Sequence, residues 1–423
     1  MRRLLTALVG ISLSANVFAS QFAIVGGKVH TLTDQGTLSE ATVLIKDGLI
    51  ERIIEGSQVP RGYERIEATG KVVTPGLIGA YTALGLVEVG MSAGQVDSST
   101  SEHPVTTVGA AIDVSYGVNA DSTLIPITRI EGFTAAATGI EYSDYLFKGQ
   151  GSVIQLTDSE PLIKARAFMA LSVNNSSASD AGGTRGTLWV ALTQALSEAQ
   201  AAIGTDLAPT QPWYGMISRA DAVALGHVVQ GHKPLLIKAD RKADILQIIA
   251  LKHKFTDLNL VLVSGSDAWR VGAQLAAAEI PVILNPEYNL PGAFDTLGAS
   301  LANAGRLEKA GVKVAIGIDT HNIRLATQHA GNAVANGLSH ATGLASLTKH
   351  VAEIFGLDNQ MGHIAPGMRG DVVVWSGDPL EVTEAAEHVF INGKPIKMVS
   401  RQTLLRDRYL NLKQDKPMAY TRP

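Results

Sequence analysis

The stretch VTPGLI at residues 73–78 marks the position at which the chain changes its secondary-structure pattern. Upstream of it, residues 21–73 contain short β-prone runs, turn signals such as Asp47-Gly48, and little helical periodicity. Downstream of it, short apolar runs alternate with helical stretches. The stretch therefore separates a β segment from a long α/β region.

The far end of the chain returns to the β pattern. An apolar run, VVVW, occupies residues 372–375, and Asn392-Gly393 between two β-prone runs is typical of a hairpin turn. Neither end of the chain has enough strands to bury a core alone. We therefore predict that residues 20–73 and 367–398 pair into one small β-sandwich domain.

The region between the two ends, residues 74–366, contains apolar runs without alternation, which favour buried parallel strands. Eight such runs fit a (β/α)8 barrel of the TIM type, with an open doubly wound sheet as the alternative. The predicted strands cover residues 73–78, 132–137, 152–156, 167–173, 234–239, 258–263, 281–284 and 312–318. The fold class is therefore α/β.

The first residues of the sequence have the pattern of a secretory signal peptide. Arg2 and Arg3 precede an apolar run over residues 4–13, and Val17-Phe18-Ala19 offers small residues for cleavage after Ala19. We expect residues 1–19 to be removed on export to the periplasm, with no membrane anchor afterwards. Residues 399–423 are expected to form a C-terminal helix and tail.

The composition excludes several classes of function. Hydrophobic residues make up 46% and charged residues 17% of the 423 residues, which allows a large core. The formal net charge of −4 gives no basis for a nucleic-acid partner. The chain has no cysteine, so disulfides, thiolate metal sites and a cysteine nucleophile are excluded. We expect a small-molecule substrate. Whether the chain forms a homo-oligomer is left open by the sequence.

Three motifs occur in an order that is specific for one family. They are KDGLI at residues 46–50, VTPGLI at residues 73–78 and GHIAPGMRGDVVV at residues 362–374. Together they resemble the amidohydrolase superfamily, and most of all its imidazolonepropionase-like and adenosine- or dihydroorotase-related metal-dependent hydrolases. The resemblance implies a barrel with a composite β domain and an activity against C–N bonds.

The same resemblance implies a divalent metal held by His-x-His after the first strand, two later histidines and an aspartate. Tyr81 and Ala83 occupy the first two positions, and Lys238 and Ser264 the next two. Only the aspartate after the eighth strand, Asp319, is retained. We therefore expect no metal and no other cofactor. A metal site rebuilt around carboxylated Lys238 with Asp240, Glu88 and Asp319 is the alternative.

Four residues at predicted strand ends are candidates for catalysis, because such side chains converge on the mouth of a barrel. Lys238 and Asp240 share a face after the fifth strand, and Asp319 and His321 share one after the eighth. An Asp-His pair can supply a general base, and a lysine can stabilise an oxyanion or act as a nucleophile. Alternatively, Lys238 and Asp319 form an ion pair in a former metal site.

Six further side chains are candidates for substrate binding, each with a structural alternative such as a turn or a surface position: Tyr81, Glu88, Arg129, Arg185, Asn285 and Glu287. The sequence thus predicts an exported hydrolase of non-peptide C–N bonds, in a cyclic amide or an N-acyl or dipeptide-like substrate, with a degenerate, metal-free site. The alternative is a non-catalytic protein of this fold that binds a small molecule or partner at the mouth.

Overall fold

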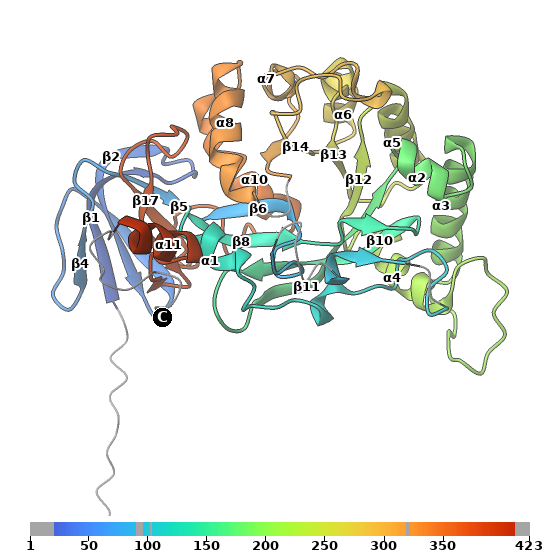
Figure 1. The fold of residues 1–423 in the computed structure, drawn as a ribbon, viewed down its shortest axis with the longest axis horizontal. Coiled ribbons are helices and arrows are strands. Elements are labelled where there is room, and N and C mark those ends of the chain that lie inside the picture. The colour runs from blue at the N-terminus through green and yellow to red at the C-terminus, as the bar shows by residue number, and fades with distance from the viewer. Residues whose placement is uncertain (1–20, 90–95, 102–103, 319–321, 411–423) are drawn as a thin grey trace, which may run out of the picture.

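The computed structural model of the protein (Figure 1) describes residues 21–89, 96–101, 104–318 and 322–410. The expected signal peptide lies outside these residues. Two large sheets organise the described chain, and each contains eight strands. No helix in the described ranges is long and apolar enough to cross a membrane.

The first sheet takes its strands from both ends of the chain. Strands β1, β2 and β5 from the N-terminal part of the chain lie side by side with β17 from its C-terminal part in Figure 1. Antiparallel pairing of β5 with β16 joins the two ends. All eight strands form one hydrogen-bonded sheet, so the predicted sandwich of two sheets is not confirmed. The strands are β1 (Gln21–His30), β2 (Thr37–Lys46), β3 (Leu49–Glu55), β4 (Glu64–Glu67), β5 (Val72–Pro75), β16 (Val372–Trp375), β17 (Ala386–Ile391) and β18 (Lys394–Pro395).

Two tight turns of this sheet pack against each other, as their sequences require. Asp47 and Gly48 connect β2 to β3 with φ values of 51° and 85°, and Asn392 and Gly393 connect β17 to β18 with 52° and 71°. A Cβ on Gly393 would lie 2.6 Å from the Cα of Gly48. Glycine is therefore needed here both for the left-handed backbone and for the close approach.

The second sheet is a nearly closed barrel, with strand order β15-β14-β13-β12-β11-β10-β8-β6. A parallel bridge between Tyr81 and Ile318 connects the first strand to the segment after the last. This bridge contradicts the open-sheet alternative. The strands are β6 (Leu77–Thr82), β8 (Phe133–Thr138), β10 (Phe147–Gln155), β11 (Leu162–Ser172), β12 (Leu235–Ala239), β13 (Leu260–Ser264), β14 (Val282–Leu284) and β15 (Val314–Ile316).

One strand of the barrel corrects the prediction of an all-parallel sheet. β10 runs antiparallel to both of its neighbours, β8 and β11. Only residues 156–161 connect β10 to β11, whereas a parallel crossover needs roughly a dozen residues or more. The barrel is therefore mixed, and its third and fourth strands form a hairpin instead of two β/α units.

The helices cover the outside of the barrel and follow mainly its later strands (Figure 1). They are α1 (Leu124–Arg129), α2 (Asn175–Asp180), α3 (Arg185–Ala201), α4 (Arg219–Val229), α5 (Lys242–Lys254), α6 (Gly272–Ala277), α7 (Asn303–Lys309), α8 (Ala326–Ala335), α9 (His340–Ala345), α10 (Lys349–Ile354) and α11 (Arg401–Leu410). Short 3-10 helices are η1 (Val96–Ser98), η2 (Val114–Tyr116), η3 (Ala268–Val271), η4 (Phe294–Thr296) and η5 (Ile323–Leu325), and β7 (Ser99–Thr100) pairs with β9 (Tyr142–Ser143).

The barrel interior is filled by residues that alternate along its strands. Ile78 and Ala80 of β6, Leu236 of β12 and Val261 and Val263 of β13 belong to one buried cluster. The same cluster contains α10, which adds Val351, Ala352 and Ile354. Because side chains alternate with a period of two along a strand, Lys238 follows Leu236 on the inward face. The interior is therefore packed up to the level at which Lys238 begins the mouth.

Candidate active site at the barrel mouth

All barrel strands except β10 have their carboxyl ends at one end of the barrel, and the antiparallel β10 begins there. This end contains the segment after β6, the loop between β8 and β10, and the residues after β11 to β15. Catalytic side chains of barrel enzymes occupy this end. We describe it as the mouth.

Two lysines meet at the mouth. Lys148 is the second residue of β10 and Lys238 is the fourth of β12, and both are half-buried. The ammonium of Lys148 donates a hydrogen bond to the carbonyl oxygen of Glu141, at 2.6 Å. Burial, and then the charge of Lys238, lower the pKa of Lys148 to about 8, against an opposing effect of Glu141. Lys148 can therefore lose its proton close to neutral pH.

Sequence reasoning missed Lys148. The sequence predicts a parallel third strand over residues 152–156, whose mouth end would lie near residue 156. In the structure, β10 begins at Phe147 and runs the other way. A lone charged residue at the start of an otherwise uncharged strand is the available signal, and it points to the mouth only if the strand is antiparallel.

Tyr81 lies beside this pair on β6. Its hydroxyl donates to the carbonyl oxygen of Ile140 at 3.3 Å, and its ring packs edge-on against Phe168 with the ring centroids 6.1 Å apart. Burial raises the pKa of Tyr81 well above its usual range, so the phenol stays neutral. Tyr81 can contribute a neutral hydroxyl and a ring edge to the mouth.

Asp240, which follows β12, and Ser264, at the end of β13, are joined by a hydrogen bond. The Oδ1 atom of Asp240 accepts hydrogen bonds from the hydroxyls of Ser264 and Ser266, both at 2.7 Å, and from the backbone N–H of Ser266 at 3.1 Å. Ser264 has a φ of 75°, which is unusual for a residue with a side chain. This network holds the Asp240 carboxylate in one orientation.

The side chains at the four histidine positions do not fit a divalent metal. Ala83 is fully buried and has no donor atom, and the Tyr81 hydroxyl is directed to a backbone carbonyl. The Ser264 hydroxyl is directed to Asp240, and two lysines repel a cation. Within the described ranges, no group of three or more His, Asp or Glu residues could hold a metal ion. Asp319 and His321 lie outside the described residues.

The remaining predicted binding residues have protein partners. Glu88, after β6, accepts a hydrogen bond from Asn119 at 2.7 Å. Asn285, after β14, accepts from the backbone N–H of Glu287 at 2.9 Å, which is a turn contact. The carboxylate of Glu287 accepts from Asn332 of α8. These side chains lie at the mouth end but are held by local contacts.

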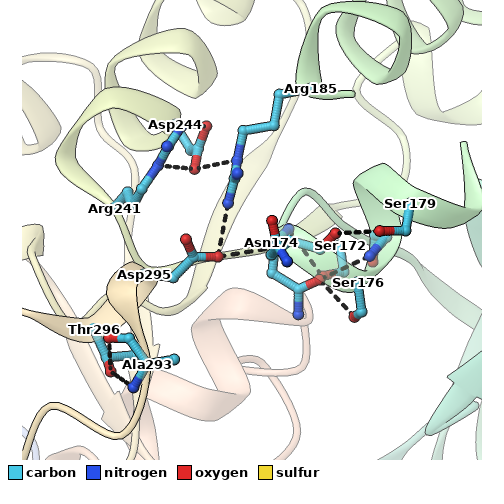
Figure 2. Close-up of polar contacts among 12 residues, drawn as sticks. Ser172, Asn174, Ser176, Ser179, Arg185, Arg241, Asp244, Ala293, Asp295 and Thr296 are labelled. Carbon is cyan, nitrogen blue, oxygen red and sulfur yellow. Dashed lines mark hydrogen bonds and ion pairs between the residues drawn. The ribbon is translucent and has the colours of Figure 1, made fainter. Parts of the chain in front are cut away.

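Arg185 is part of a charge network at the start of α3, which Figure 2 shows. Its guanidinium lies 3.1 Å from Asp244 and 2.7 Å from Asp295. Asp244 also pairs with Arg241 at 2.9 Å, and Asp295 accepts from the backbone N–H of Asn175. Arg185 is therefore neutralised by two carboxylates and joins α3, α5 and η4.

Arg129 corrects one prediction, because it does not lie at the mouth. It ends α1, directly before β8, and residues that precede a parallel strand lie at the opposite end of the barrel. There it pairs with Asp158 of the β10–β11 loop at 2.6 Å. The structure therefore does not bring Arg129 to the other candidate residues.

The comparisons with known proteins agree with this architecture. The model of the amidohydrolase family matches residues 254–397, from the end of α5 to β18. The curated relative amidohydrolase tasK of Hapsidospora irregularis is 34% identical over an alignment of 117 residues, and the match covers 24% of this chain. The match spans only 12% of that relative's length.

Solved structures extend the likeness to most of the chain. An amidohydrolase from Thermotoga maritima MSB8 has a TM-score of 0.79 at 24% identity, over 89% of this chain and 99% of that one. A Xaa-Pro dipeptidase with bound methionine has a TM-score of 0.55 at 14% identity, over 89% and 100%. At these identities the structures show the fold. Together with the family model over residues 254–397, they agree with the resemblance of the three sequence motifs to the amidohydrolase superfamily, and the chain has the amidohydrolase fold.

Proposed function

We propose that the protein is a hydrolase that cleaves a C–N bond in a small amide substrate at the barrel mouth. The observation that carries this proposal is the pair of Lys148 and Lys238, in which one amine has a pKa of about 8 beside a second cation. A lysine in such surroundings can act as a base close to neutral pH. The similarity to amidohydrolases supports the reaction class.

The proposed reaction uses water as the nucleophile. The neutral amine of Lys148 takes a proton from the water, whose oxygen bonds to the amide carbon. The Lys238 ammonium stabilises the oxyanion that forms. The C–N bond then breaks, and the leaving nitrogen takes the proton from Lys148. The network of Asp240 and Ser264 holds the loop beside Lys238 in place.

The charges at the mouth favour a substrate that carries a carboxylate. N-acyl amino acids, dipeptide-like molecules and cyclic amides that retain a free carboxylate meet this requirement, and the similar dipeptidase structure contains an amino acid. Asp319 and His321 stay predictions for a second general base. We also propose export to the periplasm, because Arg2, Arg3 and the apolar run that follows them have the signal-peptide pattern.

The test is turnover by the purified protein against a panel of N-acyl amino acids, dipeptides, lactams and hydantoins, with and without added Zn²⁺ or Mn²⁺. Amine or ring-opened product is measured directly. We expect Lys148→Met to lower kcat/KM by about 100-fold or more, because a general base contributes roughly that much. Lys309→Met, on the exposed face of α7, is the matched control.

A second function is favoured by the substitutions at the metal-ligand positions. Tyr81, Ala83, Lys238 and Ser264 also suit a mouth that binds a small carboxylate without reacting. In that case the panel raises the melting temperature without product, and Lys238→Met abolishes the rise. Product formation that is lost in Lys148→Met and kept in Lys309→Met would exclude this second function.

A further inference from the structure

A cavity lies at the end of the barrel opposite the mouth. It has a volume of about 560 Å³ and is enclosed by β10, β11, α4 and the residues before β12. Its polar lining consists of Gln150, Arg166, His227, His232 and Lys233. None of these residues belongs to the proposed hydrolytic site, and the cavity can be examined independently of it.

Lys233 forms the floor of this cavity. Its side chain is buried, with 7% of the residue exposed, and its ammonium donates a 2.6 Å hydrogen bond to Oε1 of the equally buried Gln150. Among the described residues, Gln150 is the acceptor that the structure gives this ammonium, which has three N–H groups. Burying a cation against a neutral amide is unfavourable unless a further acceptor is supplied.

The surroundings of Lys233 are positively charged. Burial, and then the charge of Arg166, lower the pKa of Lys233 to about 8; Lys164 acts in the same direction and Asp113 opposes them. Three cations against one carboxylate leave a local formal charge of +2, in a chain whose net charge is −4. An anion in the cavity would remove this repulsion.

The rim of the cavity adds three more donors. Arg166 has a φ of 50° at an irregular pairing of β10 with β11, and its Nε atom lies 3.6 Å from Asp113. Its side chain is 61% exposed, so most of the guanidinium is available to a ligand. His227 of α4 and His232 are also exposed, with ring centroids 6.3 Å apart. Backbone strain of this kind is typical of functional positions.

We propose that this cavity binds a phosphate-type dianion, with the ammonium of Lys233 at its floor and the guanidinium of Arg166 at its rim. The Lys233 ammonium, the Arg166 guanidinium and two imidazoles match the charge and the several acceptor oxygens of a phosphate group. The volume of about 560 Å³ exceeds what a bare phosphate fills and leaves room for a small organic group.

Calorimetric titration of the full chain with inorganic phosphate and with glycerol 3-phosphate tests the proposal, with glycerol and chloride as blanks at constant ionic strength. We expect binding of both anions and of neither blank. Tighter binding of glycerol 3-phosphate identifies a phosphate monoester as the ligand, and equal binding identifies free phosphate. Absence of binding by both anions overturns the proposal.

Two variants locate the binding site. Lys233→Met and Arg166→Gln should each weaken phosphate binding by about tenfold or more, because each removes a charge-assisted hydrogen bond. Arg166 is exposed, so its variant stays informative if Lys233→Met disturbs folding. Lys309→Met should bind as the wild type does. Binding that is unchanged in both cavity variants would overturn the proposal, and neither result depends on whether the mouth hydrolyses an amide.

Discussion

At the scale of single residues, Lys148 determines how the proposed activity should depend on pH. Its pKa of about 8 in the folded protein leaves the amine mostly protonated at pH 7 and mostly neutral above pH 8. Because only the neutral amine takes a proton from water, kcat/KM should rise with pH through about 8 and then level off. A profile of kcat/KM from pH 6 to 10 measures this.

The charge of the neighbouring Lys238 provides a control for this pH profile. Lys238→Met removes a cation that lowers the pKa of Lys148, so the rising limb should shift to higher pH, whatever the loss of rate. Lys309→Met should leave the limb in place. A limb that stays at the same pH in Lys238→Met would show that another group titrates.

The stability of the folded protein should depend on pH through His30. Burial, and then Lys28 and His340, lower the pKa of His30 from 6.5 to about 4. The unfolded chain therefore binds more protons between these values, and stability should fall as pH decreases from about 6.5 to 4. Between pH 6.5 and 5, the free energy of unfolding should fall by roughly 1 to 2 kcal/mol less in His30→Gln than in the wild type. Urea unfolding at each pH measures this difference. An equal loss in both proteins would assign the effect to other groups.

The resemblance of the sequence predicts which side chains stand at the family's metal-ligand positions, because those positions lie at the ends of the predicted strands. It did not indicate their partners. The hydrogen bonds of Asp240 with Ser264 and Ser266 depend on the left-handed backbone at Ser264, which no local pattern predicts. Lys148 was missed for a related reason, since its place at the mouth depends on the direction of β10.

At the scale of elements, the hairpin of β10 and β11 depends on a glycine. The ring of Phe168 in β11 lies against Gly151 in β10, where a Cβ would be 1.9 Å from a ring carbon. Gly151→Ala should therefore force the ring to move and destabilise the protein by about 1 to 3 kcal/mol. Denaturant unfolding at constant pH measures the change.

Gly226 of α4 is the matched control for this substitution. A Cβ there meets nothing within 4 Å, and the residue lies inside a helix. Gly226→Ala should stabilise the protein by about 0.5 to 1 kcal/mol, because alanine favours the helix. Equal effects of the two substitutions would show that packing against Phe168 is unimportant.

The existence of the barrel strands could be predicted from apolar runs, but their directions could not. A buried strand is apolar on both faces whether it is parallel or antiparallel. The connection decides, and the turn-forming residues between β10 and β11 (Thr157, Asp158, Ser159 and Pro161) were the signal for a hairpin.

At the scale of the whole molecule, the β domain and the barrel share one hydrophobic core. Leu77 and Phe133 of the barrel belong to the same buried cluster as Val373, Trp375 and Val389 of the first sheet. The sequence indicated that the two chain ends pair, because each was too short to bury a core. It did not indicate that the joint sheet is packed into the barrel, since such contacts connect residues far apart in the chain.

Trp375 is the centre of this contact, and it predicts how the molecule unfolds. Its indole N–H donates to the hydroxyl of Thr74 at 2.9 Å, and its ring lies 2.4 Å from where a Cβ on Gly132 would be. Because one core spans both parts, calorimetry should show a single unfolding transition. Trp375→Phe should lower the free energy of unfolding by about 2 kcal/mol, because it removes the hydrogen bond and leaves a cavity, and it should shift the whole transition to lower temperature. Trp213→Phe, which removes an indole hydrogen bond to nearby Ile217 at the edge of the same core, should lower the free energy of unfolding by less than Trp375→Phe does. Two separate transitions in the wild type would contradict a shared core.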